Sequence, residues 1–513
     1  TIEEVHGVRL DLAAIPQEPA VYRMLTRADT VGVFQVEPRA QMATLPRLKP
    51  KTFYDLAIEV ALIRPGPIQG HSVHPFLRRR NGEEEVRYPH PSAEPVLAKT
   101  LGVPVFQEQL MELARVCAGY TPGQSDRLRQ AMTHKRSDEE MAKLRAETYA
   151  GMAGRGVTGK AADEIWEKLQ GFASFGFPES HAVSFAYIVY MSAWLRAHWP
   201  AEYLAGLLNA QPMGFYSPNS LVADARRHGV VVLPPDVNES NFDCTVIPWA
   251  AAEDDLATVA GLSWRRGRGL VDDPPHLATA VRLGLRYVRD LGEAEITRLE
   301  AARFVGGPFT GVVDLAQRTG LKVEGLGGLA AAGALACLGV ARREGLWAAG
   351  ALAGMGPGRL ALAEGAEAPP LAPMTRGEES RADLWATGDS GHHPVEFVRE
   401  WLGARGCLPI AEVLGSRHGR RVAVGGLITH RQRPMTAKGV IFLNLEDETG
   451  LLNVVVLPGV WEANREVARR SVGVVLEGVV EYRDGVTNLV ARRFHAWPEE
   501  VRDVRARNWA YWG

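Results

Sequence analysis

The sequence predicts a protein of several domains, in which two mostly helical domains precede a small β-barrel. The chain has 513 residues, more than one hydrophobic core usually organises, so about three domains are expected. Apolar side chains recur at helical spacing through residues 1–235, which predicts a mostly α-helical first domain. After residue 420, apolar and polar side chains alternate as they do in strands.

Composition and charge exclude several classes of protein. Hydrophobic residues make up 46% of the chain, and the net charge of −2 argues against a uniformly basic nucleic-acid binder. The four cysteines are far apart and form no CxxC pair, so we expect reduced thiols and no bound zinc. The longest apolar run, Ala182 to Leu195, is shorter than the roughly 20 residues of a membrane span. Because no signal peptide begins the sequence, a cytoplasmic protein without membrane contact is expected.

A basic amphipathic helix is the most informative feature of the first domain. The segment SDRLRQAMTHKR combines one apolar face with four cations, Arg127, Arg129, Lys135 and Arg136. Guanidinium groups suit phosphate because their planar fork donates two parallel hydrogen bonds. An isolated stretch of this kind is more often a solvated basic face, so its neighbours decide the interpretation.

Three neighbouring motifs carry further polar candidates. ALIRPGPIQG holds Arg64 on a loop stiffened by two prolines, and Arg78 and Arg79 belong to a basic triplet soon after it. GVPVFQEQLMELARV places Gln107 at the start of an amphipathic helix. FGFPESHAVSFAYIVY carries His181 after an aromatic-glycine turn.

Together with GVFQVEPRAQM at residues 32–42, these motifs resemble the fingers region of a bacterial C-family DNA polymerase, the alpha subunit of polymerase III. FPESHAVSFA, ADLWATG and THRQRPMTAKGVIFLNLEDETG resemble the error-prone (ImuC-type) branch of that family. The resemblance implies a DNA-directed DNA polymerase of translesion synthesis and DNA repair, with residues 1–235 as its fingers region.

The resemblance also implies roles for individual residues. Arg127, Arg129, Lys135 and Arg136 would bind the triphosphate of the incoming dNTP, and Gln107 and His181 would lie near the nucleotide. Arg64, Arg78 and Arg79 would hold the backbone of the template or primer DNA.

Residues 236–350 follow a double proline and predict a tandem helix-hairpin-helix domain. VRDLGEAEITRLEAAR, from Val288 to Arg303, has the pattern of a hairpin whose second helix can face a phosphate with its N-terminus. The commonest version has a glycine where Asp290 stands, so DNA contact and structural packing are equal alternatives. A second, alanine-rich unit at residues 315–339 is expected to be structural.

Residues 351–395, rich in Gly, Pro and Ala, predict a linker. Replicative relatives carry a clamp-binding peptide here, which begins with Gln. In this chain Asp383, Leu384 and Trp385 keep the apolar and aromatic anchor, but Arg381 replaces the Gln, whose amide would satisfy buried backbone groups. Weak or absent direct clamp binding is expected. Packing of Trp385 on a neighbouring domain is the alternative.

Residues 396–500 predict five strands, with a helix from Glu462 to Arg470 after the third. This pattern is typical of an OB-fold, whose open face commonly binds single-stranded nucleic acid. The first strand and its loop would present His430, Arg431, Arg433 and Lys438, and Phe442 would offer a stacking surface. A plain barrel module is the alternative, and residues 501–513 are expected to form a C-terminal tail.

Nucleotidyl transfer requires carboxylates that hold two Mg²⁺ ions, and no convincing pair is found. Asp254–Asp255 and Asp272–Asp273 lie in loop-like surroundings, and Glu446, Asp447 and Glu448 are expected to be surface carboxylates at a barrel turn. The resemblance implies that a preceding palm domain holds Mg²⁺. This chain would then be a C-terminal portion without a catalytic residue or metal ligand of its own, inactive by itself.

The resemblance further implies partners. These are primer-template DNA, a Y-family-like protein that binds the sliding clamp, and a RecA-like accessory protein, so that contact with the clamp would be indirect. A noncatalytic DNA-binding scaffold of a repair assembly is the alternative function, since it needs no palm. A helicase loader built from hairpin and OB modules would have no use for the IRPGP and FPESHAVSFA motifs.

Overall fold

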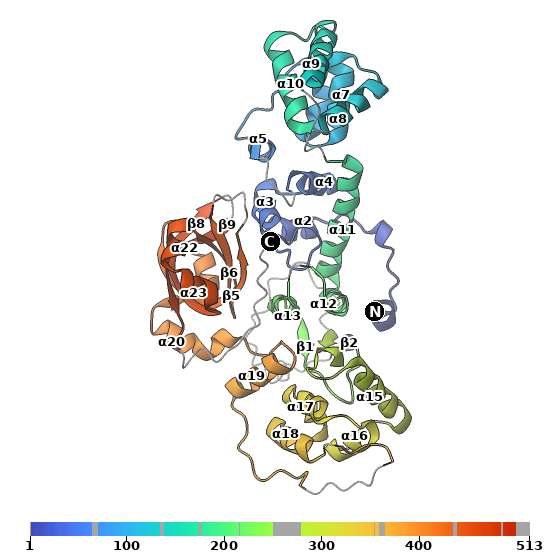
Figure 1. Cartoon of the computed structure of the whole chain (residues 1–513), viewed down its shortest axis with the longest axis vertical. Coiled ribbons are helices and arrows are strands. Elements are labelled where there is room, and N and C mark those ends of the chain that lie inside the picture. The colour runs from blue at the N-terminus through green and yellow to red at the C-terminus, as the bar shows by residue number, and fades with distance from the viewer. Residues whose placement is uncertain are drawn as a thin grey trace. The chain divides into compact units, whose positions relative to one another are not determined.

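The computed structural model describes residues 2–63, 70–133, 138–173, 177–214, 216–249, 279–352, 354–358, 365–433, 439–483 and 486–498 (Figure 1). Contacts divide the chain into two compact units. We call Leu12–Trp194 the helical unit, and Thr1–Asp11 together with Leu195–Gly513 the barrel unit. Among the described residues, no helix is long and apolar enough to cross a membrane.

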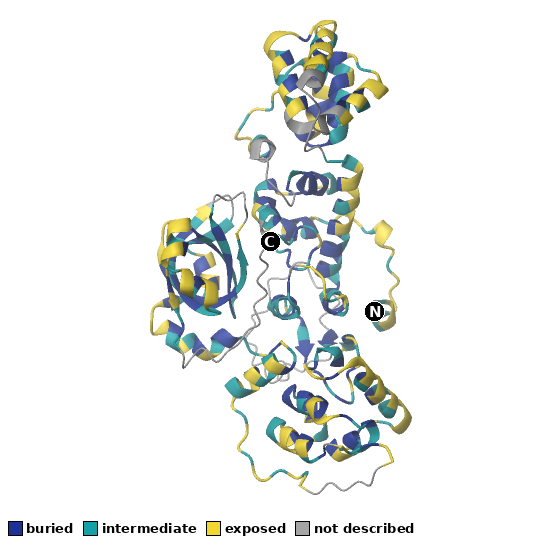
Figure 2. Ribbon diagram, in the orientation of Figure 1, coloured by how far each residue is buried: buried dark blue, intermediate teal, exposed yellow. Residues whose placement is uncertain are grey.

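The helical unit is built from helices, as predicted. Its main elements are α2 (Pro19–Thr26), α3 (Arg39–Leu48), α4 (Phe53–Leu62), α5 (Gly70–Arg80), α6 (Glu94–Leu97), α7 (Gln107–Ala118), α8 (Pro122–Thr133), α9 (Asp138–Ala153), α10 (Gly159–Ala173) and most of α11 (Glu179–His198). Helices α7 to α10 surround a core that includes Leu113, Leu128, Met152 and Ile165 (Figure 2). Leu128, on the apolar face predicted for the basic helix, is buried in this core.

The barrel unit begins with helices and a short sheet. Its elements before the barrel are α1 (Ile2–His6), α12 (Pro200–Asn209), α13 (Pro218–Arg227), β1 (Val231–Leu233), β2 (Thr245–Pro248), β3 (Thr279–Arg282), α15 (Glu293–Gly306), α16 (Val312–Thr319), α17 (Val323–Ala331), α18 (Arg342–Ala351) and α19 (Arg376–Ala386). Strand β3 pairs in parallel with β1 and antiparallel with β2. Helices α15 to α18 bury a core around Leu299, Leu315 and Leu329. The predicted helical hairpin domain thus also contains strands.

Five strands close into the predicted barrel. The elements are α20 (Arg399–Gly403), β4 (Cys407–Leu408), α21 (Ile410–Leu414), β5 (Arg421–Gln432), β6 (Ile441–Asp447), β7 (Gly450–Val456), α22 (Pro458–Ala463), α23 (Arg465–Arg470), β8 (Gly473–Arg483) and β9 (Val486–Ala496). The strand order is β4-β5-β6-β7-β9-β8, and pairing of β5 with β8 closes it. The parallel β7–β9 pair is the one exception to antiparallel pairing among the five strands β5 to β9. This arrangement confirms the OB-fold prediction.

The helix predicted between the third and fourth strands is divided in two at Asn464. Its side chain donates to the carbonyl of Val460 at 2.8 Å and accepts the backbone N–H of Phe494 at 3.2 Å. These bonds tie the break to strand β9. The inner face of the barrel is apolar, and Val424, Leu443 and Leu476 are fully buried there.

The predicted linker contains a helix that packs on the hairpin domain. Ala386, at the end of α19, is buried in the same core as Leu329. The backbone N–H of Arg289, in the hairpin turn, donates to the carbonyl of Ala386 at 2.7 Å. Helices α12 and α13, placed by the sequence in the first domain, are grouped by their contacts with the barrel unit.

Buried ion pairs connect α13 to the segments that follow α19. Arg226 donates two hydrogen bonds to the carboxylate of Asp389, at 3.0 and 2.8 Å, and a third to the carbonyl of Ser390 at 2.6 Å. The side chains of Arg226 and Asp389 are each 9% exposed. Because both charges have left bulk water, each depends on the other for its stabilisation.

The next residue of α13 connects to the barrel. Arg227 donates to Glu446 of β6 at 2.9 Å, and the two side chains are 12% and 5% exposed. Arg399, which begins α20, contacts Asp447 at 2.8 Å and Glu448 at 2.6 Å. The expectation of surface carboxylates is therefore wrong for Glu446 and Asp447, because arginines distant in sequence fold over this turn. Asp447 is fully buried and also accepts the backbone N–H of Ile410 at 2.8 Å.

Replacing Arg226 by Met should strongly destabilise the protein. The substitution leaves the Asp389 carboxylate buried without its partner, which costs about 3–5 kcal/mol in the free energy of unfolding. Chemical denaturation followed by circular dichroism measures this cost. Arg470→Met is the matched control, because Arg470 and Glu466 form an exposed pair at 3.5 Å and losing it should cost under about 1 kcal/mol. Equal effects of the two substitutions would contradict the assignment.

Helix α4 of the helical unit contains a buried carboxyl group. Glu59 is fully buried, and neither of its carboxylate oxygens has a hydrogen bond to a residue that the structure describes. Burial raises its pKa well above the usual range, because the ionised form would lose its hydration. Asp55, one turn earlier, is paired instead with Arg80 at 2.6 Å.

Replacing Glu59 by Gln should stabilise the protein at alkaline pH. A raised carboxyl pKa means that the folded state holds the proton more tightly than the unfolded chain. The contribution of Glu59 to the free energy of unfolding is therefore fully present below its ordinary pKa of about 4.3. As pH rises above that value, the contribution falls by about 1.4 kcal/mol per pH unit until the raised pKa is reached. Thermal unfolding at pH 8 should show a higher midpoint for Glu59→Gln, with the difference vanishing near pH 4. Glu167→Gln, at an exposed site on α10, should show no such trend.

Candidate nucleic-acid interface

Helix α8 presents one predicted cation to solvent and holds another in an ion pair. Arg127 is exposed, and among the described residues its side chain has no hydrogen bond or ion pair. Arg129 is half-buried and contacts the Asp126 carboxylate one turn earlier, with Nε and Nη2 at 2.9 and 2.8 Å from Oδ1. Lys135 and Arg136 lie outside the described residues.

The N-termini of α7 and α11 meet, which brings two predicted residues into one region. The backbone N–H of Gln107 donates to the carbonyl of Phe177 at 3.0 Å, and Phe106 and Phe177 form a β-bridge. The Glu108 carboxylate accepts the backbone N–H of Glu179 at 2.9 Å. Gln107 and His181 therefore lie at the same junction, as their predicted shared role near a nucleotide requires.

The junction depends on a carboxylate that sequence reasoning missed. Glu179 accepts hydrogen bonds from the Lys99 ammonium at 2.7 and 2.8 Å and from the Tyr54 hydroxyl at 2.6 Å. Burial alone would raise the pKa of Glu179, but the hydrogen bonds from Lys99 and Tyr54 outweigh it and lower the pKa. Glu179 is thus ionised at neutral pH and holds α11 against α4 and the loop before α7.

A second missed residue shapes the start of α7. Gln109 is buried, and its side-chain oxygen accepts the backbone N–H groups of Val105 and Phe106 at 2.8 and 3.1 Å. Its amide nitrogen donates to the Thr100 hydroxyl at 2.8 Å. Of the two glutamines in FQEQ, Gln109 is therefore structural, and Gln107 is the more accessible one. A glutamine three residues after the N-cap residue, here Phe106, is a capping signal that the sequence does carry.

Four aromatic rings line up along α11. The centroid of the exposed His181 ring lies 5.1 Å from Phe177 and 4.2 Å from Phe185. Phe185 in turn lies 5.3 Å from Phe34, whose side chain is partly exposed. The backbone N–H of Phe34 donates to the Ser192 hydroxyl at 3.2 Å, which fixes the ring against the helix. We call Phe34, Phe177, His181 and Phe185 the aromatic ladder.

In the basic triplet at the end of α5, one predicted arginine is exposed and the other is held by bonds within the protein. Arg78 is exposed and lies 3.4 Å from Glu84. Arg79 is more buried, and it contacts Glu84 at 2.9 Å and donates to the Leu101 carbonyl at 2.8 Å. Intramolecular bonds therefore occupy the Arg79 guanidinium, and Arg78 is the more available of the two predicted DNA ligands. Arg64 lies outside the described residues.

The helix-hairpin-helix turn is capped by the chain's own carboxylates. Asp290 adopts the left-handed conformation, with φ of 61°, where a glycine is commonest. The backbone N–H of Gly292, before α15, donates to the Glu295 carboxylate at 3.1 Å, and Glu293 also lies in the first turn. These negative charges occupy the helix end that a phosphate would need. The geometry favours the structural alternative for this hairpin.

The predicted DNA-binding face of the barrel is partly engaged in structure. The His430 ring lies edge-on to Tyr216 at 5.4 Å. Arg431 donates to the carbonyls of Ala468 and Ser471 at 2.9 and 2.5 Å, at the end of α23, and burial lowers its pKa to about 10. Arg433 is exposed, Phe442 is half-buried on β6, and Lys438 lies outside the described residues.

The clamp-peptide remnant belongs to helix α19. Asp383 pairs with Arg342 at 2.7 Å, and burial raises its pKa to about 6 despite that partner. Trp385 is about half exposed, with the Arg289 guanidinium 4.8 Å from its ring centre. Leu384 is half-buried and Arg381 is exposed. The alternative that Trp385 packs on a neighbouring domain agrees with this arrangement.

Comparison with known proteins shows which proteins the chain resembles. Residues 1–156 match the bacterial DNA polymerase III alpha subunit finger domain, and residues 229–345 match a helix-hairpin-helix motif. The error-prone DNA polymerase of Mycolicibacterium paratuberculosis is 50% identical over 96% of this chain and 43% of its own length. That of Mycobacterium tuberculosis is 52% identical over the same shares. Nearly the whole chain is therefore similar to part of the error-prone DNA polymerases.

The chain spans less than half the length of those relatives. The error-prone DNA polymerase of Corynebacterium efficiens is 50% identical over 95% of this chain and 42% of its own length. Among solved structures, asparaginyl-tRNA synthetase from Pyrococcus horikoshii matches 17% of the chain with 23% identity and a TM-score of 0.15, too low to indicate a shared fold. The predicted family and branch are thus confirmed.

Three carboxylates of the barrel lie close to arginines and do not fit a magnesium site. Glu446, Asp447 and Glu448 are neutralised by Arg227 and Arg399, whereas Mg²⁺ requires carboxylates free to bind it with water. The pairs Asp254–Asp255 and Asp272–Asp273 lie outside the described residues.

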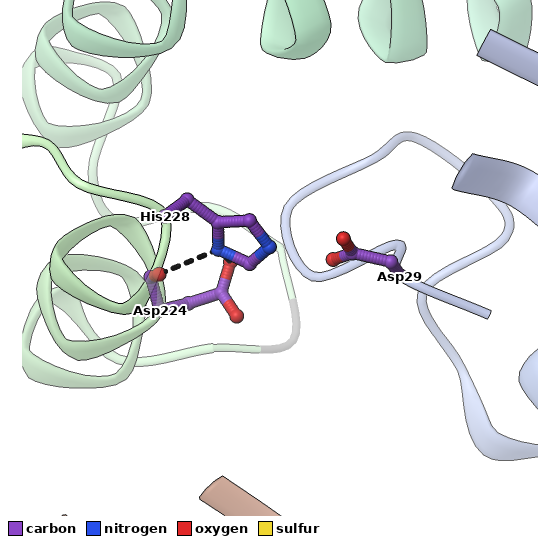
Figure 3. Close-up of side chains that lie close together, drawn as sticks. All are labelled: Asp29, Asp224 and His228. Carbon is purple, nitrogen blue, oxygen red and sulfur yellow. Dashed lines mark hydrogen bonds and ion pairs between the residues drawn. The ribbon is translucent and has the colours of Figure 1, made fainter. Parts of the chain in front are cut away.

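The same reasoning applies to Asp224 of α13. His228 Nδ1 lies 2.8 Å from the backbone oxygen of Asp224 (Figure 3). The Asp224 carboxylate contacts Arg196 at 2.8 Å and Arg227 at 3.6 Å, so its charge is already compensated. The third residue labelled in Figure 3, Asp29, belongs to the helical unit.

Proposed function

We propose that this chain supplies the nucleotide- and DNA-binding part of a DNA-directed DNA polymerase that extends primers past damaged template. Two observations carry the proposal. Arg127 on α8 is exposed and has no side-chain partner among the described residues, and the N-termini of α7 and α11 meet at an ordered junction. Helices α7 and α8 lie within residues 1–156, which match the finger domain. A fixed junction and a free guanidinium are what binding of a triphosphate beside a nucleobase requires.

The contacts of the residues in the helical unit suggest a different role for each of them. Arg127 would neutralise phosphate charge of the incoming dNTP, joined by Lys135 and Arg136, while Arg129 would need to leave Asp126 to do so. Gln107 and His181 would orient the nucleotide at the junction. Arg78 and Arg64 would hold DNA backbone, and Arg79 would position the end of α5 through Glu84 and Leu101.

The chemistry of bond formation would come from outside these residues. Two Mg²⁺ ions, held by a palm domain, would activate the primer 3′-hydroxyl and stabilise the leaving pyrophosphate. On the barrel, His430, Arg433, Lys438 and Phe442 would contact single-stranded template. A cytoplasmic Y-family-like partner and a RecA-like accessory protein would bring the polymerase to the sliding clamp, since the clamp-peptide remnant of α19 is folded as a helix.

A noncatalytic scaffold of a repair assembly is the second candidate. It is favoured by the arginine-neutralised carboxylates, since a scaffold needs no metal site.

Primer extension with magnesium distinguishes the two functions. We expect extension by a longer form of the protein that includes the palm, and none by this chain, because the described carboxylates near arginines do not fit Mg²⁺. Extension by this chain would contradict the proposed division of labour. A lack of primer extension by the longer form, under conditions in which a relative is active, would favour the scaffold function.

Replacing Arg127 by Ala should weaken nucleotide binding selectively. Removing a charged hydrogen bond to phosphate costs about 1.5–3 kcal/mol, so the KM for dNTP in the longer form should rise about tenfold or more. The Kd for primer-template DNA should change less than about twofold. Arg115→Ala is the matched control, because Arg115 is exposed on α7 and paired with Glu112 at 2.7 Å. Equal losses in nucleotide and DNA affinity would contradict the triphosphate assignment.

A further inference from the structure

A groove runs over the outer side of the barrel, across strands β5, β8 and β9. Its volume is about 530 Å³. Its lining includes Arg421, Ala423, Glu477, Val479 and Arg492. Val422 and Val480, which adjoin lining residues in the chain, belong to the barrel core. Because successive side chains of a strand point to opposite faces, Ala423 and Val479 face outward.

The groove is separate from the predicted DNA-binding residues of the barrel. Arg421 is the first residue of β5, whereas His430 and Arg431 lie near the end of this strand. The two surfaces can therefore bind different ligands.

Cations lie on both sides of the groove. Strand β8 lies between β5 and β9, and its Val479 pairs with Arg421 of β5 and with Val490 of β9. Neighbouring strands are about 4.8 Å apart, so β5 and β9 are separated by about 10 Å. Arg421 therefore borders the groove on one side and Arg492 on the other, and Glu477 lies on the strand between them.

A β-bulge places Arg492 at the groove. Glu477 pairs with Arg493 and the next residue, Gly478, pairs with Ala491, so Arg492 is the extra residue of β9. A residue of this kind has no partner in the ladder, and the bulge redirects its side chain. Gly478 suits the bulge, because a Cβ there would lie 2.6 Å from a backbone carbonyl oxygen of β9. The fold thus accommodates a local irregularity that adds a cation to the groove.

The cations around the groove are not used by the fold. Arg421, Arg492 and Arg493 are exposed, and their guanidinium groups make no hydrogen bond or ion pair among the described residues. The same holds for Arg417, in the turn before β5. A guanidinium group can donate two parallel hydrogen bonds to one carboxylate. The groove therefore offers several binding positions for acidic groups.

One carboxylate lies among these cations. The Glu477 side chain is 47% exposed, and its Oε1 lies 3.2 Å from Nε2 of His495. An ionised carboxylate accepts hydrogen bonds and repels other negative groups. A ligand that lies over Glu477 must therefore bring hydrogen-bond donors as well as negative charges.

We propose that this groove binds an extended, acidic segment of a partner protein. Successive side chains of an extended peptide point in opposite directions, so two neighbouring acidic residues reach Arg421 on one side and Arg492 on the other. The backbone N–H groups of the same peptide supply the donors that Glu477 requires. The small side chains of Ala423 and Val479 let a peptide backbone approach the sheet closely.

A single strand of DNA fits these features less well. Its phosphates follow one edge of the strand and its bases follow the other, whereas the cations lie on both sides of the groove. Sites for single strands add aromatic rings on which bases stack, and none of the described residues that line the groove is aromatic. The charge pattern therefore favours a peptide, and the inference does not depend on the proposed function.

Binding of fluorescein-labelled decaglutamate to this chain, followed by anisotropy at constant salt, tests the proposal. The double variant Arg421→Glu with Arg492→Glu should bind at least about tenfold more weakly, because two attractive contacts become repulsive. The control with Arg465→Glu and Arg470→Glu makes the same change in net charge at exposed sites on α23, and its affinity should stay within about twofold. Equal losses in the two variants, or no binding by the unaltered chain, would overturn the proposal.

A neutral substitution separates the shape of the groove from its charge. Val479→Trp fills the groove without changing the net charge, so it should weaken decaglutamate binding several-fold. Circular dichroism checks that the variant keeps its fold. An unchanged affinity would show that the peptide does not lie in the groove, and the proposal would fail.

An oligonucleotide identifies the kind of ligand. With ten-nucleotide oligothymidine as the probe, the variant carrying Arg421→Glu and Arg492→Glu should lose no more affinity than the control carrying Arg465→Glu and Arg470→Glu. A loss as large as that for decaglutamate would mean that the groove is a nucleic-acid surface, which contradicts the proposal. Because these comparisons measure binding alone, their outcome is independent of primer extension by the longer form.

Discussion

Helix α13 carries Asp224, Arg226 and Arg227 into surroundings from which water is largely excluded, and the barrel unit is organised around their partners. Arg226 requires Asp389 and Arg227 requires Glu446, because an unpaired charge in such a place costs several kcal/mol. The two partners come from different segments, so a single helix fixes both of them. Buried pairs of this kind add little net stability over apolar packing. Any other packing of these segments would be unfavourable, because it would leave a buried charge unpaired.

The helical unit also contains a carboxylate that joins separate segments, and its desolvation is less unfavourable. Glu179 remains partly exposed, and it receives one charged and one neutral donor, from Lys99 and Tyr54. Its desolvation is therefore smaller than that of Glu446 or Asp447. The result is a fixed start for α11 that keeps His181 and the aromatic ladder at the surface. A ring held in place this way loses little freedom when a nucleobase stacks on it.

Local patterns predicted the elements well, because strand alternation and helical spacing are properties of neighbouring residues. The five strands and the buried position of Leu128 followed from them. The roles of polar residues were harder to predict, because they depend on distant partners. Arg399 lies 48 positions before Asp447 in the chain, so nothing near EDET indicated burial. Arg431 resembles the exposed Arg433 in sequence, yet it caps α23. Glu295, three residues after Gly292, is one local capping signal that could have been recognised.

The bond between Arg227 and Glu446 has an evolutionary consequence. OB-folds are commonly treated as interchangeable modules, joined to their neighbours by flexible linkers. Here an exchange of the barrel alone between this chain and a relative would leave an arginine on α13 or a carboxylate on β6 unpaired where little water reaches it. Recombination would succeed only when the crossover carries α13 along with the barrel. The heritable module therefore begins about two hundred residues before the barrel's first long strand.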